Sequence, residues 1–197
     1  MARMPSAERR RQLVEAAVRV MARDGVARTT TRSICAEAGV SLSVFHYCFD
    51  SKQALLEAAI GSITGNYVAR VMSAVEPRAT LRETVRGALG TYWDHVTAHP
   101  AEHMLTYELT QYALREEGFE HLARAQYEQY VASAAILIEQ VCALREVTPK
   151  VPVQLLARVL AATIDGLTLQ YLVLGDERAA ADLLDTTAEH LVALIEG

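Results

Sequence analysis

The side chains best suited to chemistry gather in the middle of the chain, where histidines, tyrosines and the single tryptophan recur at helical spacing. His95, His99 and His103 are each four residues apart, a spacing that would align metal ligands along one helix. Pro100 breaks that helix between them, and no cysteine lies near to complete a ligand set. We therefore predict no metal site.

Sequence signatures of catalysis are missing. There is no G-x-S-x-G nucleophile motif, no phosphate-binding glycine loop and no acid pair in an evident cleft. Cys35, Cys48 and Cys142 form no C-x-x-C pair and fit a reducing cytoplasm, where they act as small apolar groups. A redox switch of Cys35 with Cys48 is disfavoured because Cys35 fits a packed core. We expect binding, not enzymatic activity, and no cofactor.

The element that positions the remaining polar side chains is the segment 29–52, TTTRSICAEAGVSLSVFHYCFDSK. Thr30 or Thr31 can cap a short helix, and Gly39 fits the left-handed residue that ends it. Ser41 can cap a second helix, which turns Phe45 inward. Two short helices joined by a glycine-containing turn form a helix-turn-helix, whose second helix enters a DNA major groove.

The residues 39–59, GVSLSVFHYCFDSKQALLEAA, resemble the signature of the tetracycline-repressor (TetR) family of bacterial transcription regulators. The matching features are the Gly-Val-Ser turn, the aromatic pair before Phe49, and Ser51-Lys52 at the start of the next helix. The resemblance covers about residues 6–60, and beyond them only length and helical character agree. It implies an all-α regulator with a small effector held among its middle helices and a dimer formed by its C-terminal helices.

The resemblance places DNA-backbone contacts at Tyr47, Lys52 and the segment 30–32. The chain departs from the common family pattern at Leu42, Val44, Cys48 and Asp50. Leu42 or Val44 could contact a thymine methyl group, whereas Ser43 and His46 could bond base edges or phosphate. The predicted DNA-contacting residues are Thr30, Thr31, Arg32, Ser41, Leu42, Ser43, Val44, His46, Tyr47 and Lys52.

The charge distribution supports DNA binding by one end of the chain, although the net charge is −5. Residues 1–52 hold nine Lys/Arg and five Asp/Glu, for a net charge of +4, and the rest of the chain has −9. A basic head on an acidic body indicates that only the head meets phosphate. We also expect at least one of Arg9, Arg10 and Arg11 to contact the DNA backbone.

Helical periodicity, caps and breaks predict about nine helices and no strand. Ser6, Thr80 with Glu83, and Asp176 are expected helix caps. We predict a DNA-binding domain over residues 1–52 and a ligand-binding and dimerisation domain over residues 53–197. The last two helices are apolar on more than one side, which indicates pairing with a second copy.

The aromatic and polar set of the middle helices suits a mostly apolar effector pocket, although any one of its members could instead be ordinary core or surface. The predicted ligand-binding residues are Tyr67, Trp93, Met104, Tyr107, Gln111, Tyr127 and Thr163.

These observations predict a cytoplasmic, homodimeric repressor that binds a palindromic double-stranded DNA operator and is released by a small, largely apolar effector. The alternatives are an activator of the same fold and a helical ligand- or partner-binding protein that no longer reads DNA specifically. No run of eighteen apolar residues occurs, because the stretch 131–138 is too short and Asp165 interrupts the run after Val159, so we predict no membrane span. The N-terminus has charges without an apolar stretch behind them, unlike a secretory signal.

Overall fold

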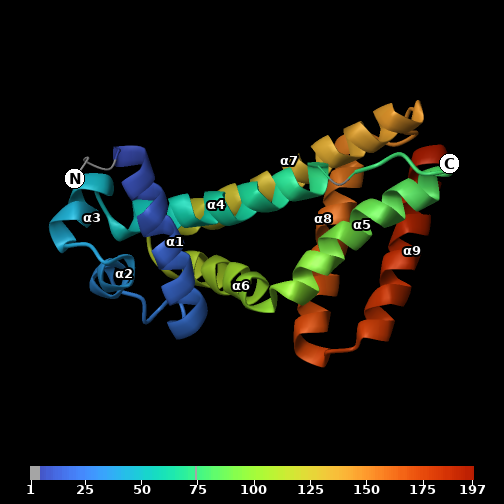
Figure 1. Cartoon of the computed structure of the whole chain (residues 1–197). Helices are drawn as coiled ribbons and strands as arrows, with labels where there is room; N and C mark the ends of the chain where they lie inside the picture. Colours follow the sequence, from blue (N-terminus) through green and yellow to red (C-terminus); the bar gives the residue numbers. More distant parts are fainter. Residues whose placement is uncertain (1–4, 74) are drawn as a thin grey trace. The chain divides into compact units, whose positions relative to one another are not determined.

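The secondary structure of the protein is α-helical in the computed structural model. The model describes the backbone of residues 5–73 and 75–197, and the side chains in this part except those of residues 64 and 66–73. Within that part there are nine helices and no strand (Figure 1). They are α1 Ser6–Asp24, α2 Thr31–Ala38, α3 Leu42–Cys48, α4 Lys52–Ser73, α5 Leu81–Ala98, α6 Pro100–Arg115, α7 Glu120–Arg145, α8 Val153–Leu174 and α9 Glu177–Glu196. The predicted all-α fold is confirmed.

The chain divides into two compact units, which are described separately. The head unit comprises Met1–Gly65 and Ala101–Gln126, and the body unit comprises Asn66–Pro100 and Tyr127–Gly197. The boundary predicted at residue 52 separates DNA binding from ligand binding and dimerisation, whereas these units are defined by packing alone. That boundary therefore stays a prediction.

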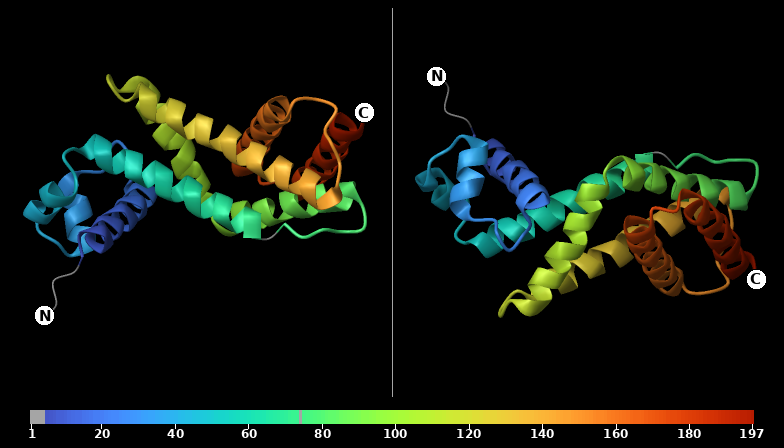
Figure 2. Two further views of the ribbon diagram at one scale, coloured as in Figure 1. Left: turned by 90° about the horizontal axis from the view of Figure 1, so that it is seen from above. Right: turned by 90° about the horizontal axis from the view of Figure 1, so that it is seen from below.

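The head unit has one continuous apolar core. Its helices α1, α2 and α3 form a compact group in both views of Figure 2. The core also takes in the first turns of α4 and the buried side of α6. Its largest side chains are Leu13, Met21, Ile34, Phe45, Phe49, Leu55, Leu56, Leu105, Leu109 and Leu122. The helix-turn-helix is therefore held by packing from α6 as well as by α1 and α4.

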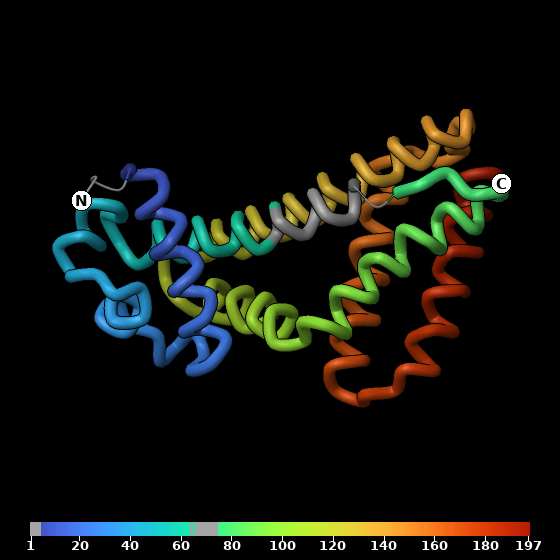
Figure 3. The backbone as a smooth tube through the Cα atoms, viewed as in Figure 1, coloured from blue at the N-terminus to red at the C-terminus, as the bar shows by residue number. Residues whose placement is uncertain are grey.

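In the body unit, α5 and α8 both pack against α9. The chain turns back from α8 into α9 at Gly175, whose left-handed φ of 66° ends α8 (Figure 3). Leu156, Leu160 and Leu167 supply the inner side of α8. By length and composition α8 could cross a membrane, with a mean hydropathy of 1.3 over 18 residues. Its outer side carries exposed Leu155, Leu169 and Val173.

Three of the predicted caps form. The Thr30 side chain accepts a hydrogen bond from the Ser33 N–H at 3.1 Å, and the Ser33 hydroxyl in turn accepts from the Thr30 N–H at 3.0 Å. The same reciprocal bonding joins Thr80 and Glu83 at the start of α5, and Asp176 caps α9. Each satisfies backbone donors that a helix start leaves without a partner.

Two predicted caps are wrong. Ser6 is the first residue of α1, not its cap, because the helix begins one residue earlier in register, with the Pro5 carbonyl accepting from the Arg9 N–H. Ser41 occupies the cap position of α3, but its side chain does not bond the helix backbone. Its hydroxyl lies 2.7 Å from the Ser43 hydroxyl, which competes for the same oxygen.

Candidate functional site

The helix-turn-helix presents one side of α3 to solvent and buries the other. Phe45 is 1% exposed and packs against Phe49, with ring centroids 5.8 Å apart. Gly39 ends α2 with a left-handed φ of 64°, and the Val40 N–H bonds the Cys35 carbonyl across the turn at 2.9 Å. This turn sets the direction in which α3 leaves α2.

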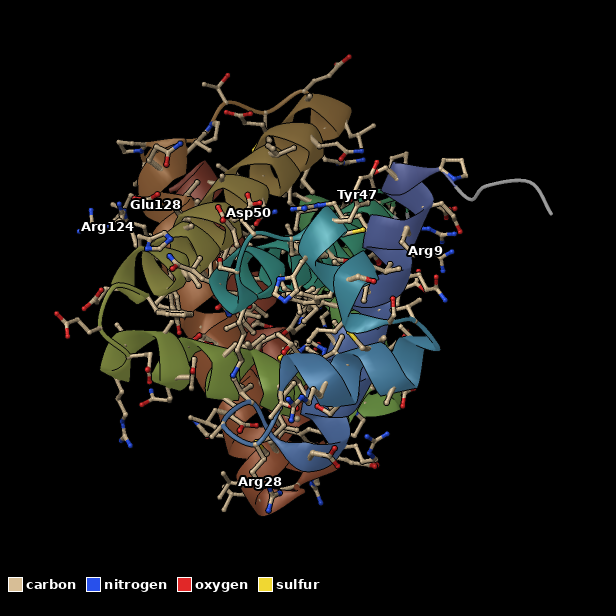
Figure 4. All side chains as sticks on the ribbon, turned by 90° about the vertical axis from the view of Figure 1, so that its left-hand side faces the viewer. Arg9, Arg28, Tyr47, Asp50, Arg124 and Glu128 are labelled. Carbon is tan, nitrogen blue, oxygen red and sulfur yellow. The ribbon has the colours of Figure 1, made fainter. Side chains whose placement is uncertain are left out.

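The outward side of α3 carries the residues expected to contact DNA. Ser43 and His46 are exposed, Leu42 is 38% exposed and Tyr47 is 67% exposed. In Figure 4 Tyr47 projects from α3 at the surface of the head. Val44 is only half-buried, so it lies at the margin of this surface. The polar and apolar contacts that the sequence predicted for base reading thus share one exposed helix side.

The other predicted contacts flank α3. Thr30, Arg32 and Ser41 are exposed, and Thr31 is half-buried at the start of α2. Thr30 already uses its side-chain oxygen in the capping box, so any phosphate contact from it has to share that oxygen with the cap.

The N-terminal arginines bond within the head. The Arg10 guanidinium donates to the Cys48 carbonyl at 2.7 Å and lies 4.0 Å from the centroid of the Phe49 ring. Arg10 therefore ties α1 to the end of α3. Arg11 pairs with Glu8 at 2.6 Å and with Glu15 at 3.3 Å on its own helix, where such exposed pairs contribute little to stability.

A second group of charges joins α1 to α2. Arg19 and Arg23 contact the Glu37 carboxylate at 2.9 and 3.2 Å. Hydrogen bonds from these two guanidinium groups lower the pKa of Glu37. These ion pairs join α2 to α1, and they lower the number of arginines left to meet phosphate.

Lys52 starts α4 and is half-buried. Its ammonium nitrogen lies 5.2 Å from the centroid of the Tyr112 ring on α6. Burial lowers the pKa of Lys52, and the nearby Glu116 carboxylate partly offsets that shift. The predicted phosphate contact therefore has to compete with an aromatic neighbour inside the head unit.

Two further contacts join α6 and its following turn to the head. The Glu108 carboxylate accepts a hydrogen bond from the Val26 N–H at 2.7 Å, in the turn between α1 and α2. The Gln53 amide donates to the Gly118 carbonyl at 3.3 Å. Sequence reasoning missed the Glu108 contact, because its partner is 82 residues away in the chain.

Aromatic side chains from three helices gather in the body unit. The rings of Trp93 on α5 and Tyr171 on α8 meet edge to face, with centroids 4.9 Å apart. Tyr127 and Tyr130 on α7 meet in the same way at 5.6 Å. Tyr92 is buried beside Trp93, and its hydroxyl lies 2.6 Å from the Thr168 hydroxyl. We call these five residues the aromatic cluster.

A carboxylate belongs to this cluster. The Tyr127 hydroxyl donates to Oδ2 of Asp165 on α8 at 2.8 Å. The pKa of Tyr127 is raised by burial and by this hydrogen bond, and the pKa of Tyr92 is raised by its burial, with smaller contributions from Tyr130 and Asp165. Sequence reasoning treated Asp165 only as a break in an apolar run. A single carboxylate on an otherwise apolar helix was the available signal.

The seven predicted effector residues do not fall in one unit. Met104, Tyr107 and Gln111 lie on α6 in the head unit, where Met104 and Gln111 are exposed and Tyr107 is half-buried. Trp93 and Tyr127 belong to the aromatic cluster of the body unit. The remaining body residue is Thr163, whose hydroxyl bonds the Val159 carbonyl of its own helix at 2.8 Å, and the side chain of Tyr67 lies outside the described residues.

The body unit also contains a narrow cavity with an entirely apolar lining. Its walls come from α5, α7, α8 and α9 and include Val85, Leu89, Leu137, Val141, Leu160 and Leu191. None of the seven predicted effector residues lines it. Leu137 packs on the aromatic cluster as well, so the two features are neighbours.

Two families of known sequences match this chain and together cover most of it. Residues 13–59 match the bacterial regulatory proteins of the tetR family, and residues 77–196 match the C-terminal domain of the BetI-type transcriptional repressor. The chain belongs to the TetR family. The resemblance seen in the helix-turn-helix segment is thereby confirmed, and the family extends over the body helices that the segment alone did not cover.

Individual relatives agree with this assignment. The nicotine-responsive transcriptional repressor HdnoR of Paenarthrobacter nicotinovorans is 27% identical over 187 residues, which is 95% of each chain. The regulator BetI of Brucella canis is 24% identical over 191 residues, or 96% of this chain and 92% of that protein. The solved structure of the multidrug binding protein EbrR complexed with ethidium has a TM-score of 0.68 at 28% identity, and it covers 95% of this chain and 99% of EbrR.

This TetR-family protein is therefore a transcriptional regulator. Its family and its relatives confirm the prediction of a ligand-responsive repressor. The individual DNA-contacting and effector-binding residues are not tested by these similarities and stay predictions.

Proposed function

We propose that this TetR-family regulator is a cytoplasmic homodimer that binds a near-palindromic operator and leaves it when a small molecule occupies the body. The observation that supports DNA reading best is the exposed side of α3, where Leu42, Ser43, His46 and Tyr47 share one surface. The capping box of α2 and the left-handed turn at Gly39 hold α3 in place behind that surface.

The proposed dimer rests on the outer side of α8. The exposed residues Leu155, Ala162, Leu169 and Val173 follow one another at intervals of seven, seven and four, so they form a stripe along one side of the helix. Val173 is 72% exposed. A second copy covering these stripes explains the surplus apolar surface, and it would place two α3 helices on two operator half-sites.

The proposed release works through unequal binding of the effector to two arrangements of the dimer. An effector that prefers the arrangement unsuited to the operator weakens DNA binding by the ratio of its two affinities. A coupling of roughly 1–3 kcal/mol gives about 5- to 150-fold weaker binding. The names of HdnoR, which is nicotine-responsive, and of EbrR, solved with ethidium and with imidazole, support a small-molecule effector here.

A mobility-shift and footprinting experiment on the DNA upstream of the gene tests the operator. We expect two protected half-sites and affinity that falls steeply with salt. Lys52→Ala should weaken binding to every sequence alike and reduce the salt slope by about one. The matched control is Lys150→Ala, which removes an exposed lysine from the connection between α7 and α8 and should leave the slope unchanged.

The footprint also separates the alternatives. Diffuse, salt-dependent retardation without protected half-sites would overturn operator reading and favour a head that binds DNA without sequence preference, an outcome for which the apolar Leu42 and Val44 give a reason. Protection combined with increased transcription would identify an activator.

A further inference from the structure

The start of α1 contacts the C-terminal ends of both helices of the helix-turn-helix. Arg10 donates to the Cys48 carbonyl at the end of α3, and Gln12 donates to the Ala38 carbonyl at the end of α2. We propose that these two residues, which we call the α1 clamp, position α3 for DNA reading and that Arg10 does not contact phosphate. This inference rests on the proposed operator binding and deepens it, because the sequence predicted only a backbone contact from an arginine of this segment.

The first support is the way in which α3 ends. The helix has seven residues, and Phe49 follows it in an extended conformation, with φ −140° and ψ 127°. It therefore lacks the left-handed glycine that ends α2 at Gly39. The last carbonyls of a helix have no partner within it and carry the negative end of its dipole. A guanidinium on the Cys48 carbonyl satisfies one of them and supplies the complementary charge.

The second support is that Arg10 contacts the end of α3 at two points. Its Nη1 donates to the Cys48 carbonyl at 2.7 Å, and its guanidinium carbon lies 4.0 Å from the centroid of the Phe49 ring. Phe49 is 1% exposed and packs on Phe45 of α3. A single hydrogen bond would leave α3 free to turn about it, whereas a bond and a ring contact together fix the direction of α3 relative to α1.

The third support is the fixed orientation of Gln12. Arg9 Nη1 donates to Gln12 Oε1 at 2.7 Å, so the amide oxygen faces Arg9 and the amide nitrogen faces the Ala38 carbonyl at 2.8 Å. Residues two apart on a helix point to different sides, which is why Gln12 reaches α2 while Arg10 reaches α3. The end of α2 and the end of α3 are thus both tied to α1.

A change in the direction of α3 affects base contacts and phosphate contacts unequally. Hydrogen bonds to base edges need close geometry, and a good one provides discrimination of about 5- to 150-fold. The attraction between a basic head and phosphate depends on charge and distance, so it tolerates small displacements. Loss of the α1 clamp should therefore lower the affinity for the operator more than the affinity for unrelated DNA.

Two competing interpretations predict different results. If Arg10 contacted phosphate, its loss would weaken binding to all DNA alike and reduce the salt slope by about one, as expected for Lys52. If the α1 clamp only stabilised the fold, fewer heads would be folded, but the folded ones would keep their preference for the operator. The ratio of the two affinities does not depend on the folded fraction, because both kinds of DNA need a folded head.

Fluorescence anisotropy with one labelled duplex of the footprinted operator and one of unrelated sequence measures both affinities over a range of salt concentrations. Gln12→Leu removes a donor without changing the charge, and Arg10→Met removes the guanidinium and keeps an apolar stem. For each variant we expect the operator-to-unrelated ratio to fall about tenfold or more, with a salt slope within about half a unit of the wild type. Arg10→Lys should restore part of the ratio, because an ammonium can donate to the same carbonyl.

Arg124→Met is the matched control, since it removes an exposed cation from the part of α7 that belongs to the head unit and should keep the ratio. In Figure 4 Arg124 lies apart from Tyr47. An unchanged ratio in Arg10→Met and Gln12→Leu overturns the proposal, as does a salt slope reduced by about one in Arg10→Met.

Amide hydrogen exchange of the DNA-free protein keeps this proposal distinct from the proposed operator binding. The Phe49 N–H bonds the Phe45 carbonyl at 2.8 Å at the end of α3, and it should exchange faster in Arg10→Met than in the wild type. Equal exchange would show that Arg10 does not hold this end of α3 and would overturn the α1 clamp, whether or not an operator is bound. Faster exchange in a protein that protects no half-sites would overturn the operator function alone.

Discussion

The contact between Glu108 and Val26 can be tested by removing the acceptor. Glu108→Ala deletes the carboxylate that accepts the Val26 N–H at 2.7 Å. Val26 is 0% exposed, so its N–H cannot turn to water in place of the lost bond. The neighbouring Gly25 has φ 85°, and a Cβ there would lie 3.0 Å from Glu108 Oε1, so the turn already fits closely around this carboxylate.

The expected loss of stability follows from the charge on the acceptor of this hydrogen bond. A hydrogen bond to a charged group contributes about 1.5–3 kcal/mol, and a buried donor left without a partner costs a similar amount, so Glu108→Ala should destabilise the head by roughly 2–3 kcal/mol. Glu108→Gln keeps an amide oxygen in nearly the same place and should cost only about 1 kcal/mol. With a urea slope of about 2 kcal/mol/M, the midpoint of the alanine variant should fall by about 1–1.5 M urea.

Amide hydrogen exchange at Val26 is the direct assay, because it reports on the bonded N–H itself, and urea unfolding by circular dichroism gives the free energy. The control Glu117→Ala removes an exposed acid just beyond α6 and should change neither quantity. Exchange at Val26 as slow in Glu108→Ala as in the wild type would show that this carboxylate does not protect the turn, and the argument for α6 as a support of the head would fail.

Three further predictions concern single contacts. Thr30→Ala removes one half of the capping box with Ser33 and should cost about 1 kcal/mol in urea unfolding, whereas Thr30→Ser should restore most of it. Tyr92→Phe removes the phenol partner of the Thr168 hydroxyl, whose residue is 1% exposed, and should lower the free energy of unfolding by about 1–3 kcal/mol. Adding Thr168→Val should recover part of that loss, which a double-mutant cycle measures. In an alkaline titration followed by tyrosinate absorbance, Tyr92 and Tyr127 should ionise above the usual range of a tyrosine, since the pKa of each is raised. The unfolded phenols lose protons near pH 10 while these two native ones keep theirs, so the free energy of unfolding should fall as the pH rises above about 10; a stability that is flat there would contradict the shifts.

Local features of the fold were predictable because their causes are local. Thr80 with Glu83 three residues later specifies a capping box, Thr30 is a common cap residue, and Gly39 specifies a left-handed helix end. The reciprocal bond from Ser33 to Thr30 was not predicted. The two predicted caps that did not form depend on neighbouring residues. The cap position of α1 falls on Pro5, so Ser6 lies inside the helix. The Ser41 hydroxyl bonds the Ser43 hydroxyl in place of the helix backbone.

The sites were less predictable, because they depend on contacts between distant residues. Tyr127 and Asp165 are 38 residues apart, and nothing in the spacing of either indicates the other. The aromatic residues Trp93 and Tyr127 could be selected by type alone, whereas Asp165 could not. Type alone also selected Met104 and Gln111, which are exposed on α6 in the head unit.

The exposed stripe on α8 has a consequence for how this regulator responds to its own abundance. In the proposed dimer a second copy covers Leu155, Leu169 and Val173, so the DNA-binding species is a product of two chains. Its concentration would rise with the square of copy number while monomers predominate. Repression would then switch on over a narrower range of gene dosage than a monomeric regulator allows. Newly made chains below that range would carry an uncovered apolar helix, which makes them candidates for rapid removal by the cell's proteases.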